Sequence, residues 1–347
     1  ISGGVAHASV INSGFSSYNS QTAALKAAGV RVFGPGATVA MDLEPEYIAV
    51  SADSKTAWIT CQENNALAVL DIPSATVTDI LALPFKNYGL VGNGLDASNK
   101  DDAVNIKPYP NLFGMVQPDA VAAFESGGET YLITANEGDA REYDGFEEES
   151  KISKINLDPT AFPNGADLQE KALLGNLKIT TTLGDEDGDG DYDKLFAFGG
   201  RSFSIFKPGP SSLDLVFDSG DQLEQITGAM LPNEFNSTND ENNSFDDRSD
   251  NKGPEPEGLA VGIVNQRTYA FIGLERLGGI MVYEVTDPAA PSFVQYINNR
   301  DFSGNASLGT AGDLGPEGLI FIPAGESPTG KEMLAVANEN SGTTTLY

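Results

Sequence analysis

The stretch Pro45-Glu46-Tyr47-Ile48-Ala49-Val50 predicts a β-strand that opens on a proline and an acidic residue. Two further strand-like runs follow at 56–61 and 66–72, separated by polar turns. The same pattern returns, in varying completeness, at four later places: Gln117 to Arg141, Gly184 to Phe206, Gly253 to Val285 and Gly315 to Tyr347. Repeated units of three or four short strands, about 60 to 75 residues long, are typical of a β-propeller, in which each unit buries its faces against its neighbours. The sequence therefore predicts an all-β fold, with a single β-propeller domain over residues 1–347.

The proline-acid pair recurs where the first strand of four units begins. A β-sandwich would also contain many short strands, but it would not explain this recurrence. In a propeller the first strand of each blade lines the central channel, so the acidic residues of these pairs should point towards one axis. They are Glu46, Asp119, Glu257 and Glu317. The alternative is that each pair simply opens a strand with a fixed φ and a solvated charge.

A second feature is the acidic stretch from Gly184 to Leu195. Its aspartates stand at every second position, with two glycines among them: Asp185, Asp187, Asp189, Asp191 and Asp193. Such crowded carboxylates repel one another unless a hard cation neutralises them, and calcium takes oxygen ligands from short glycine-containing loops. An EF-hand would need a glutamate where this chain has Phe196, and helices where it has strand-like flanks over 177–183 and 195–198. The stretch therefore predicts a calcium-clamped β-hairpin; the alternative is a solvated acidic turn without metal.

Long polar insertions separate the predicted strands. They cover 73–114, 141–177 and 232–251, and the first two include the runs 96–102 and 147–149. Helical turns are expected over Ser20 to Ala28 and near Leu168 to Leu174. Insertions of this length often decorate one face of a rigid scaffold and carry its function, although a disordered acidic loop is an equal expectation for 236–252.

Charge restricts the partners of the protein. The chain has 50 acidic and 20 basic residues, a formal charge of −30, so nucleic acid and anionic membrane surfaces would be repelled. No apolar run approaches the roughly 18 residues that a membrane-spanning helix needs. The single cysteine, Cys61, excludes an internal disulfide. An acidic chain that concentrates divalent cations suits an extracellular, periplasmic or cell-surface location.

Several motifs together resemble the choice-of-anchor I family. They are Asp42 to Val50, Gln62 to Ala66, Thr134 to Arg141, Gly184 to Leu195 with Gly199 to Ile205, Gly253 to Val261 and Asn338 to Tyr347. The family comprises exported or surface-anchored bacterial β-propeller proteins, related in architecture to calcium-dependent alkaline phosphatases and phytase-like esterases. Its members carry further blades upstream, so the resemblance implies that this chain covers only part of a propeller. The missing blades would come from the same polypeptide, a cleaved fragment or another chain.

The residues of this chain are compatible with few kinds of catalytic chemistry. The only histidine, His7, has no nucleophile motif nearby, and Cys61 is expected to be a buried strand residue. What remains is an oxygen-ligand site in the channel, where Glu137 and Asp139 would join the four strand-start carboxylates around calcium or manganese. Arg141 and Arg276 follow acidic turns and could clamp a phosphate; a salt bridge to a neighbouring carboxylate is at least as probable for each.

Two functions from different classes are therefore predicted. The first is an exported metal-dependent phosphoesterase acting on a phosphate ester. The second is a non-catalytic, calcium-stabilised surface module for adhesion or assembly. A catalytic site should present a metal with an open position and an arginine within reach, whereas a scaffold should pair its carboxylates with basic residues.

Overall fold

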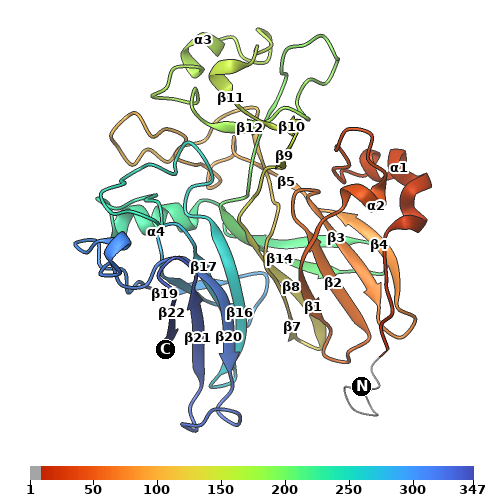
Figure 1. The fold of residues 1–347 in the computed structure, drawn as a ribbon, viewed down its shortest axis with the longest axis vertical. Coiled ribbons are helices and arrows are strands. Elements are labelled where there is room, and N and C mark those ends of the chain that lie inside the picture. Colours follow the sequence, from red (N-terminus) through yellow and green to blue (C-terminus); the bar gives the residue numbers. More distant parts are fainter. Residues whose placement is uncertain (1–8) are drawn as a thin grey trace.

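The computed structural model describes residues 9–347, and most of its regular elements are β-strands (Figure 1). The strands are β1 (Pro45–Val50), β2 (Thr56–Cys61), β3 (Ala66–Asp71), β4 (Thr76–Ala82), β5 (Phe85–Asn87), β6 (Leu112–Met115), β7 (Val121–Ser126), β8 (Glu129–Asn136), β9 (Glu142–Tyr143), β10 (Phe146–Glu147), β11 (Glu149–Lys151), β12 (Lys178–Thr180), β13 (Leu195–Ala197), β14 (Ser202–Pro208), β15 (Leu213–Asp218), β16 (Pro256–Val264), β17 (Arg267–Leu274), β18 (Ile280–Glu284), β19 (Ser292–Ile297), β20 (Pro316–Ile322), β21 (Met333–Asn338) and β22 (Thr343–Leu346). The helices are η2 (Ser16–Gln21), α1 (Thr22–Ala27), α2 (Val39–Asp42), η3 (Ile152–Lys154), α3 (Gly165–Leu168), α4 (Gln222–Met230) and η4 (Ala306–Leu308). The all-β class predicted from the sequence is confirmed.

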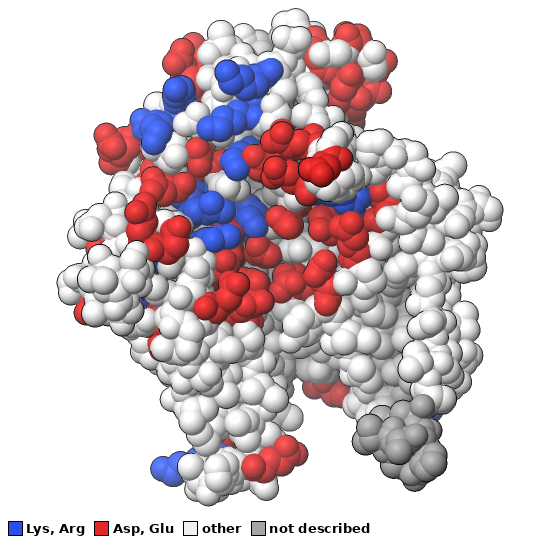
Figure 2. Space-filling view, in the orientation of Figure 1, with Lys and Arg blue, Asp and Glu red and all other residues white. Residues whose placement is uncertain are grey.

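Four antiparallel sheets form the body of the molecule. Their strand orders are β1-β2-β3-β4, β7-β8-β14-β15, β16-β17-β18-β19 and β20-β21-β22. The first strands of these sheets are neighbours, because β1 contacts β7, β7 contacts β16 and β16 contacts β20. Within residues 9–347 no comparable contact joins β20 back to β1, and a notch separates the two lower lobes of the molecule (Figure 2). The described residues therefore form no closed ring, and the propeller stays a prediction.

The unit boundaries drawn from the sequence need one correction. The strand 202–206 was expected to belong with the acidic hairpin, but β14 pairs with β8, with Ser202 opposite Asn136 and Phe206 opposite Leu132. The segment 137–201 thus leaves this sheet after β8 and returns to it at β14. Its strands β11, β12 and β13 join β5 and β6 in a mixed five-stranded sheet of order β11-β12-β13-β6-β5, in which β13 and β6 are parallel, while β9 and β10 form a separate pair. The prediction failed because β14 pairs with a strand on the far side of the insertion 137–201, and local sequence patterns do not reveal a pairing over that distance.

The flanks of the acidic stretch are strands, as predicted. β12 and β13 run antiparallel on either side of it, with Ile179 opposite Ala197. The helical turns expected over Ser20 to Ala28 are also present, as η2 and α1. The second expected helix was placed too late, because α3 ends at Leu168 and residues 169–174 form turns instead.

Apolar side chains fill the spaces between adjacent sheets. Trp58, Leu67 and Leu132 belong to the core between the β1 and β7 sheets, and Leu319 and Val336 belong to the core between the β16 and β20 sheets. These cores hold the sheets in fixed relation to one another. They thereby fix the positions of the side chains at the ends of the first strands.

Some apolar residues on the strands that border the notch are not covered in this way. Ile48 and Val50 of β1 are 53% and 45% exposed, and Ile320 of β20 is 62% exposed. Apolar residues on a strand normally face a neighbouring layer. The β20 sheet therefore presents exposed apolar residues on its outer face. On the β1 sheet only the strand β1 does so, because η2, α1 and α2 share a buried core with β2, β3 and β4.

The segment 232–251 lacks regular structure but is densely hydrogen-bonded. Asn236 is fully buried, and its amide donates to Glu224 (2.8 Å) and Ser249 (2.9 Å). The expectation of disorder for 236–252 does not fit these contacts. Asn236 begins the glycosylation sequence Asn236-Ser237-Thr238, and its burial leaves no room for a glycan there. None of the described helices is long and apolar enough to cross a membrane.

Candidate functional site

The first strands open with an irregular pairing that sets the direction of their acidic residues. β1, β16 and β20 begin at their prolines, whereas β7 begins at Val121, three residues later than the pattern predicted. In β1, β16 and β20 one extra residue is inserted directly after the proline, which breaks the register with the second strand. Such a bulge re-aims a side chain at the end of a sheet.

Asp119 lies within electrostatic reach of the other three strand-start carboxylates. Burial raises the pKa of Asp119 to about 7, helped by Glu137, Glu46 and Glu317. Burial also raises the pKa of Glu257 to about 10, with contributions from Glu137, Glu275 and Asp119. The pKa of Glu46 is raised by burial and by Glu44. These mutual effects follow from bringing like charges together at one end of the sheets.

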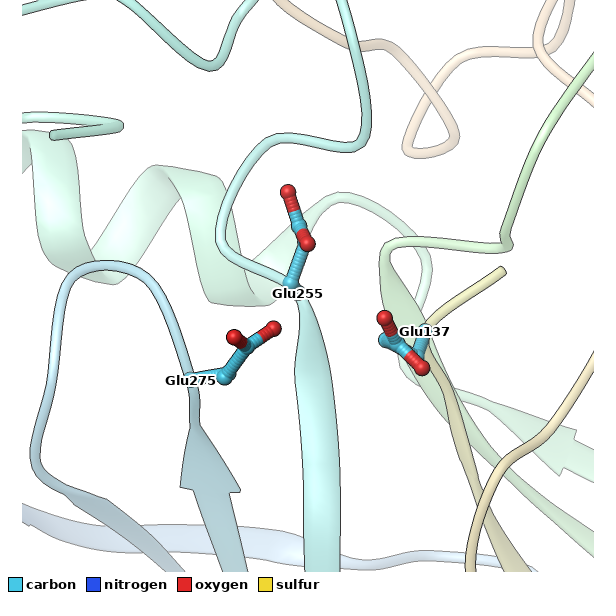
Figure 3. A group of neighbouring side chains, drawn as sticks. All are labelled: Glu137, Glu255 and Glu275. Atoms are coloured by element: carbon cyan, nitrogen blue, oxygen red, sulfur yellow. The ribbon is translucent and has the colours of Figure 1, made fainter. Parts of the chain in front are cut away.

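A tighter group of three carboxylates lies beside them. Glu137 follows β8, Glu255 precedes β16 and Glu275 follows β17, so three separate strand ends contribute (Figure 3). All three are buried, and they offer oxygen atoms within 4.8 Å of one another. We call these residues the glutamate cluster.

Basic side chains already neutralise the glutamate cluster. Nζ of Lys252 lies 2.6 Å from Oε1 of Glu137 and 3.3 Å from Oε2 of Glu255. Nε of Arg276 lies 2.8 Å from Glu255 and 3.2 Å from Glu275, and Arg248 also pairs with Glu255. Three cations thus face three carboxylates. The Lys252 ammonium lies between two of the carboxylates, where a metal ion would otherwise bridge them.

The pKa shifts of the cluster agree with this pairing. Burial opposes ionisation of Glu255, but Lys252, Arg248 and Arg276 outweigh it and lower its pKa to about 2. Burial likewise opposes the charge of Lys252, and the neighbouring glutamates Glu255 and Glu137 still raise its pKa. Glu275 differs, because burial and Glu255 raise its pKa to about 8. Glu255 and Lys252 are therefore charged at neutral pH.

The backbone around the glutamate cluster adopts unusual conformations. Glu255 and Gln117 both adopt a left-handed φ, of 51° and 38°, directly before Pro256 and Pro118. Strain of this kind costs roughly 1–3 kcal/mol per residue and persists only where surrounding contacts enforce it. The backbone segments at Gly138 and Gly199 approach closely beside Glu137. A Cβ atom on Gly199 would lie 2.0 Å from the carbonyl oxygen of Glu137, and a Cβ atom on Gly138 would lie 2.1 Å from the backbone nitrogen of Gly199.

Both predicted arginines take part in salt bridges. Arg141 is buried, donates to Asp42 (2.9 Å), pairs with Glu44 (3.2 Å) and lies 4.4 Å above the ring of Phe33. It therefore ties the N-terminal segment to the loop after β8. Arg276 lies at the glutamate cluster and also donates to Asn239 (2.9 Å). Of the two, only Arg276 lies where a ligand of the cluster would bind.

A small polar pocket opens above the cluster. Its volume is about 220 Å³, and four basic side chains line it together with Asp139, Glu142 and Glu149: Lys178, Arg248, Lys252 and Arg276. Figure 2 shows basic side chains gathered on this face among many acidic ones. Because Arg248, Lys252 and Arg276 are also paired with the glutamate cluster, little of the positive charge of the pocket is left to bind an anion.

The acidic stretch 184–195 forms a second group of carboxylates. Asp185, Asp187 and Asp193 offer oxygens within 4.8 Å of one another. Asp185 accepts from the backbone N–H of Gly188 (2.7 Å) and Gly190 (3.1 Å), so the loop wraps around this side chain.

No basic residue offsets the charge of these three aspartates. Within residues 9–347 none of the three pairs with a basic residue, since Lys194 pairs with Glu186 instead. Burial, together with Asp189, Asp158 and Asp193, raises the pKa of Asp191. Unlike the glutamate cluster, this group has no basic partner among residues 9–347.

Sequence reasoning missed part of the cluster. Glu255 and Glu275 were not among the predicted residues, nor were Lys252 and Arg248. One signal was present, because Glu275 follows the second strand of its unit as Glu137 does. Cys61 is buried as expected, which raises its pKa to about 12 and keeps it a thiol. His7 lies outside the described residues.

Comparisons with known proteins give one clear result. A family profile described as choice-of-anchor I domain matches residues 1–288. Gigasin-3a of Magallana gigas is 34% identical over 194 residues, which cover 52% of this chain and 66% of the relative. A mesenchyme-specific cell surface glycoprotein of Strongylocentrotus purpuratus is 29% identical over 283 residues, 72% of this chain and 35% of the relative. The chain thus spans less than two thirds of the length of these relatives.

Among solved structures, one similar chain is a protein of unknown function from Desulfotomaculum acetoxidans. The TM-score is 0.32 and the sequence identity is 9%, with coverage of 88% of this chain and 55% of the other.

Proposed function

Because the chain belongs to the choice-of-anchor I domain family, we propose that it is an exported, cell-surface β-rich module with a structural role. In this proposal the glutamate cluster is a buried ionic lock between strand ends, and calcium holds the loop 184–195. The name of the Strongylocentrotus purpuratus relative, a cell surface glycoprotein, supports a location outside the cell.

One observation carries the structural role. Lys252 takes the bridging position between Glu137 and Glu255, at 2.6 and 3.3 Å, and two arginines complete the neutralisation. A catalytic metal would need these carboxylates as free ligands with one position open to substrate. An ionic lock needs each charge paired, as it is here.

Calcium binding by the loop 184–195 is supported by a charge balance opposite to that of the glutamate cluster. Asp185, Asp187 and Asp193 supply hard carboxylate oxygens without a basic partner, and glycines at 188 and 190 adopt positive φ, which allows a tight loop. Bound calcium would fix β12 against β13. In this proposal the ion acts on stability rather than on chemistry.

We also propose that the four main sheets are blades of a propeller that further blades complete. The strands β1 and β20 border the open side, and their apolar residues Ile48 and Ile320 are more than half exposed there. Blades bury such faces against each other. Expressing the chain within a longer polypeptide should then bury Ile48 and Ile320 and slow amide hydrogen exchange within β1 and β20; unchanged exchange would contradict this part of the proposal.

The calcium claim is tested by thermal unfolding of the purified protein with calcium and with a chelator. Calcium should raise the melting temperature, and the double variant Asp185→Asn/Asp187→Asn should reduce that rise. The matched control Asp144→Asn/Glu147→Gln removes two exposed carboxylates elsewhere and should keep the rise. An equal loss in both double variants would mean that calcium acts only through the overall negative charge.

Metal-dependent phosphoester hydrolysis is the second candidate. It is favoured by Asp119 and Glu257, which have no ion pair within residues 9–347. Lys252, which lines the basic pocket, lies close enough to Asp119 to lower its pKa. The assay is hydrolysis of an aryl phosphate with calcium or manganese, repeated with Glu257→Gln. Chelator-sensitive turnover that Glu257→Gln removes would establish this function and displace the structural one.

A further inference from the structure

Two of the polar insertions come together at α4. Oε2 of Glu224, in that helix, accepts from the backbone N–H of Asp96 (3.3 Å), and Oε1 accepts from the amide of Asn236 (2.8 Å). Asp96 belongs to the insertion 73–114 and Asn236 to the insertion 232–251. The helix therefore brings side chains of two segments that are distant in sequence to one place.

Three side-chain oxygens in these two insertions are buried without a hydrogen-bond partner within residues 9–347. They are Oδ1 of Asp101, Oδ1 of Asn236 and Oδ2 of Asp246. Asn236 is fully buried and Asp246 is only 2% exposed. Buried acceptors are normally paired, because an acceptor that has lost its hydration without gaining a partner destabilises the fold. Three such oxygens in one region indicate a binding site for a positively charged ligand.

The Ser249 hydroxyl places two of these side chains next to each other. The amide of Asn236 donates to Oγ of Ser249 (2.9 Å), and that hydroxyl donates to Oδ1 of Asp246 (2.5 Å). The orientation of the Asn236 amide is set by Glu224, because this carboxylate is paired with Arg201 (2.8 Å) and accepts from the amide nitrogen. The hydroxyl proton is used by Oδ1, so Oδ2 of Asp246 and the oxygen of Asn236 remain available to one ligand.

Two aspartates of the first insertion add acidic oxygens to the same place. Asn105 joins them, because its backbone N–H donates to Asp96 (2.5 Å) and its side-chain amide donates to Asp101 (2.9 Å). Burial raises the pKa of Asp246 to about 8, and Asp96 and Asp101 add to the rise, so these carboxylates lie within electrostatic reach of Asp246. In the described part of the chain, 9–347, no lysine or arginine forms a salt bridge with any of the three aspartates.

The ligand that suits these oxygens is a hard divalent cation. A water molecule carries no charge and donates only two hydrogen bonds, so it can neither offset two buried carboxylates nor satisfy three acceptors. An ammonium group on a partner protein could not reach Asn236 and Asp246, because both are buried. Calcium binds carboxylate and amide oxygens in irregular geometry, whereas magnesium demands a near-ideal octahedron and keeps several waters.

We propose that Asp101, Asn236 and Asp246 bind a calcium ion inside the protein, with Asp96 beside it. Because two of the three ligands are buried, the ion can leave only when the two insertions separate. The folded protein should therefore keep it in the presence of a chelator. The site goes beyond the structural role proposed above, because it shares no residue with the glutamate cluster or with the loop 184–195.

A calcium ion at Asn236 would nevertheless support the glutamate cluster. The backbone N–H of Arg248 donates to the carbonyl oxygen of Asn236 (2.9 Å). Arg248 and Lys252, on the same segment, are two of the three cations that pair with the cluster. The ion would thus hold in place the segment that delivers these two cations.

The test is the metal content of the folded protein. The chain is purified in buffer that contains calcium, dialysed against EGTA under native conditions and analysed by plasma emission spectrometry. We expect about one calcium ion per chain to remain, and to be lost when the protein is unfolded in urea with the same chelator. The loop variant Asp185→Asn/Asp187→Asn should keep this ion. Folded, unmodified protein that retains no calcium, or that retains another metal instead, would overturn the proposal.

A matched pair of variants tests the assignment of the ligands. Asp101→Asn removes one charge from the site, and since Asp101 is only partly buried the fold should survive. This variant should retain at least roughly fivefold less calcium after the same dialysis, because ligand charge sets calcium affinity. Asp102→Asn makes the same change at the neighbouring, exposed residue, whose left-handed φ of 55° asparagine tolerates, and should retain as much calcium as the unmodified chain. Equal retention by the two variants, with the fold verified by circular dichroism, would contradict the site.

Discussion

Replacing Lys252 with methionine removes the cation from the centre of the glutamate cluster while keeping an apolar stem of similar length. Lys252 contacts Glu137 at 2.6 Å and Glu255 at 3.3 Å. Glu255 would keep Arg248 and Arg276 as partners. Glu137 would keep only the amide of Gln62, at 2.8 Å. One buried carboxylate is thus left without a counter-charge, which costs about 3–5 kcal/mol of unfolding free energy.

The loss should depend on pH. Burial already raises the pKa of Glu137, and removing Lys252 raises it further above the unfolded value. A carboxylate with a raised folded pKa costs stability as pH rises from the unfolded towards the folded pKa, because the folded state holds the proton more tightly. Lys252→Met should therefore destabilise the protein more at pH 8 than at pH 5, where Glu137 can protonate.

Urea unfolding at the two pH values measures this difference. Lys55→Met is the matched control, since Lys55 forms an exposed pair with Asp53 whose loss should cost less than about 1 kcal/mol. Adding Glu137→Gln to Lys252→Met should restore part of the stability. A loss below about 1 kcal/mol at pH 8, or an equal loss at both pH values, would refute the ionic lock.

Three further outcomes are expected. Asp119→Asn should stabilise the protein by roughly 1–2 kcal/mol at pH 8, as measured by urea unfolding. It should also flatten the fall in stability between pH 4 and 7, because the pKa of Asp119 is raised to about 7. The expected gain is smaller than the full shift in pKa would give, since the side chain is partly exposed. Asp185→Asn/Asp187→Asn should remove a calcium-induced stabilisation of about 2.7 kcal/mol at calcium a hundredfold above its dissociation constant, measured by denaturant unfolding. Gly199→Ala should lower the melting temperature strongly, because its Cβ would lie 2.0 Å from the Glu137 carbonyl oxygen; a shift within error would contradict that packing.

Local patterns were enough to predict the strands that begin at a proline. β1, β16 and β20 start at the predicted residue, because a proline-acid pair followed by alternating apolar residues is a short-range signal. The flanks of the acidic loop were predicted for the same reason. β14 was assigned to the wrong unit, because its pairing with β8 spans the insertion 137–201 and leaves no local trace.

The residues of the candidate site also fall into those that local patterns predicted and those that they did not. Glu137 and Glu257 were predicted from their positions in the repeated units, but the cation between the strand ends was not. Lys252 contacts Glu137 across 115 positions of sequence and follows a polar loop with no strand pattern. Its role depends on tertiary placement, which decides whether a buried carboxylate meets a metal or an ammonium group. The predicted arginines likewise could not be assigned without their partners.

Calorimetric titration of calcium and manganese onto the chelator-treated protein tests the central claim most directly, namely that Lys252 and not a metal neutralises the glutamate cluster. The account predicts one saturable calcium site, which Asp185→Asn/Asp187→Asn removes and Glu137→Gln/Glu275→Gln leaves intact. A second saturable site that survives in the loop variant and disappears with Glu137→Gln/Glu275→Gln would contradict it.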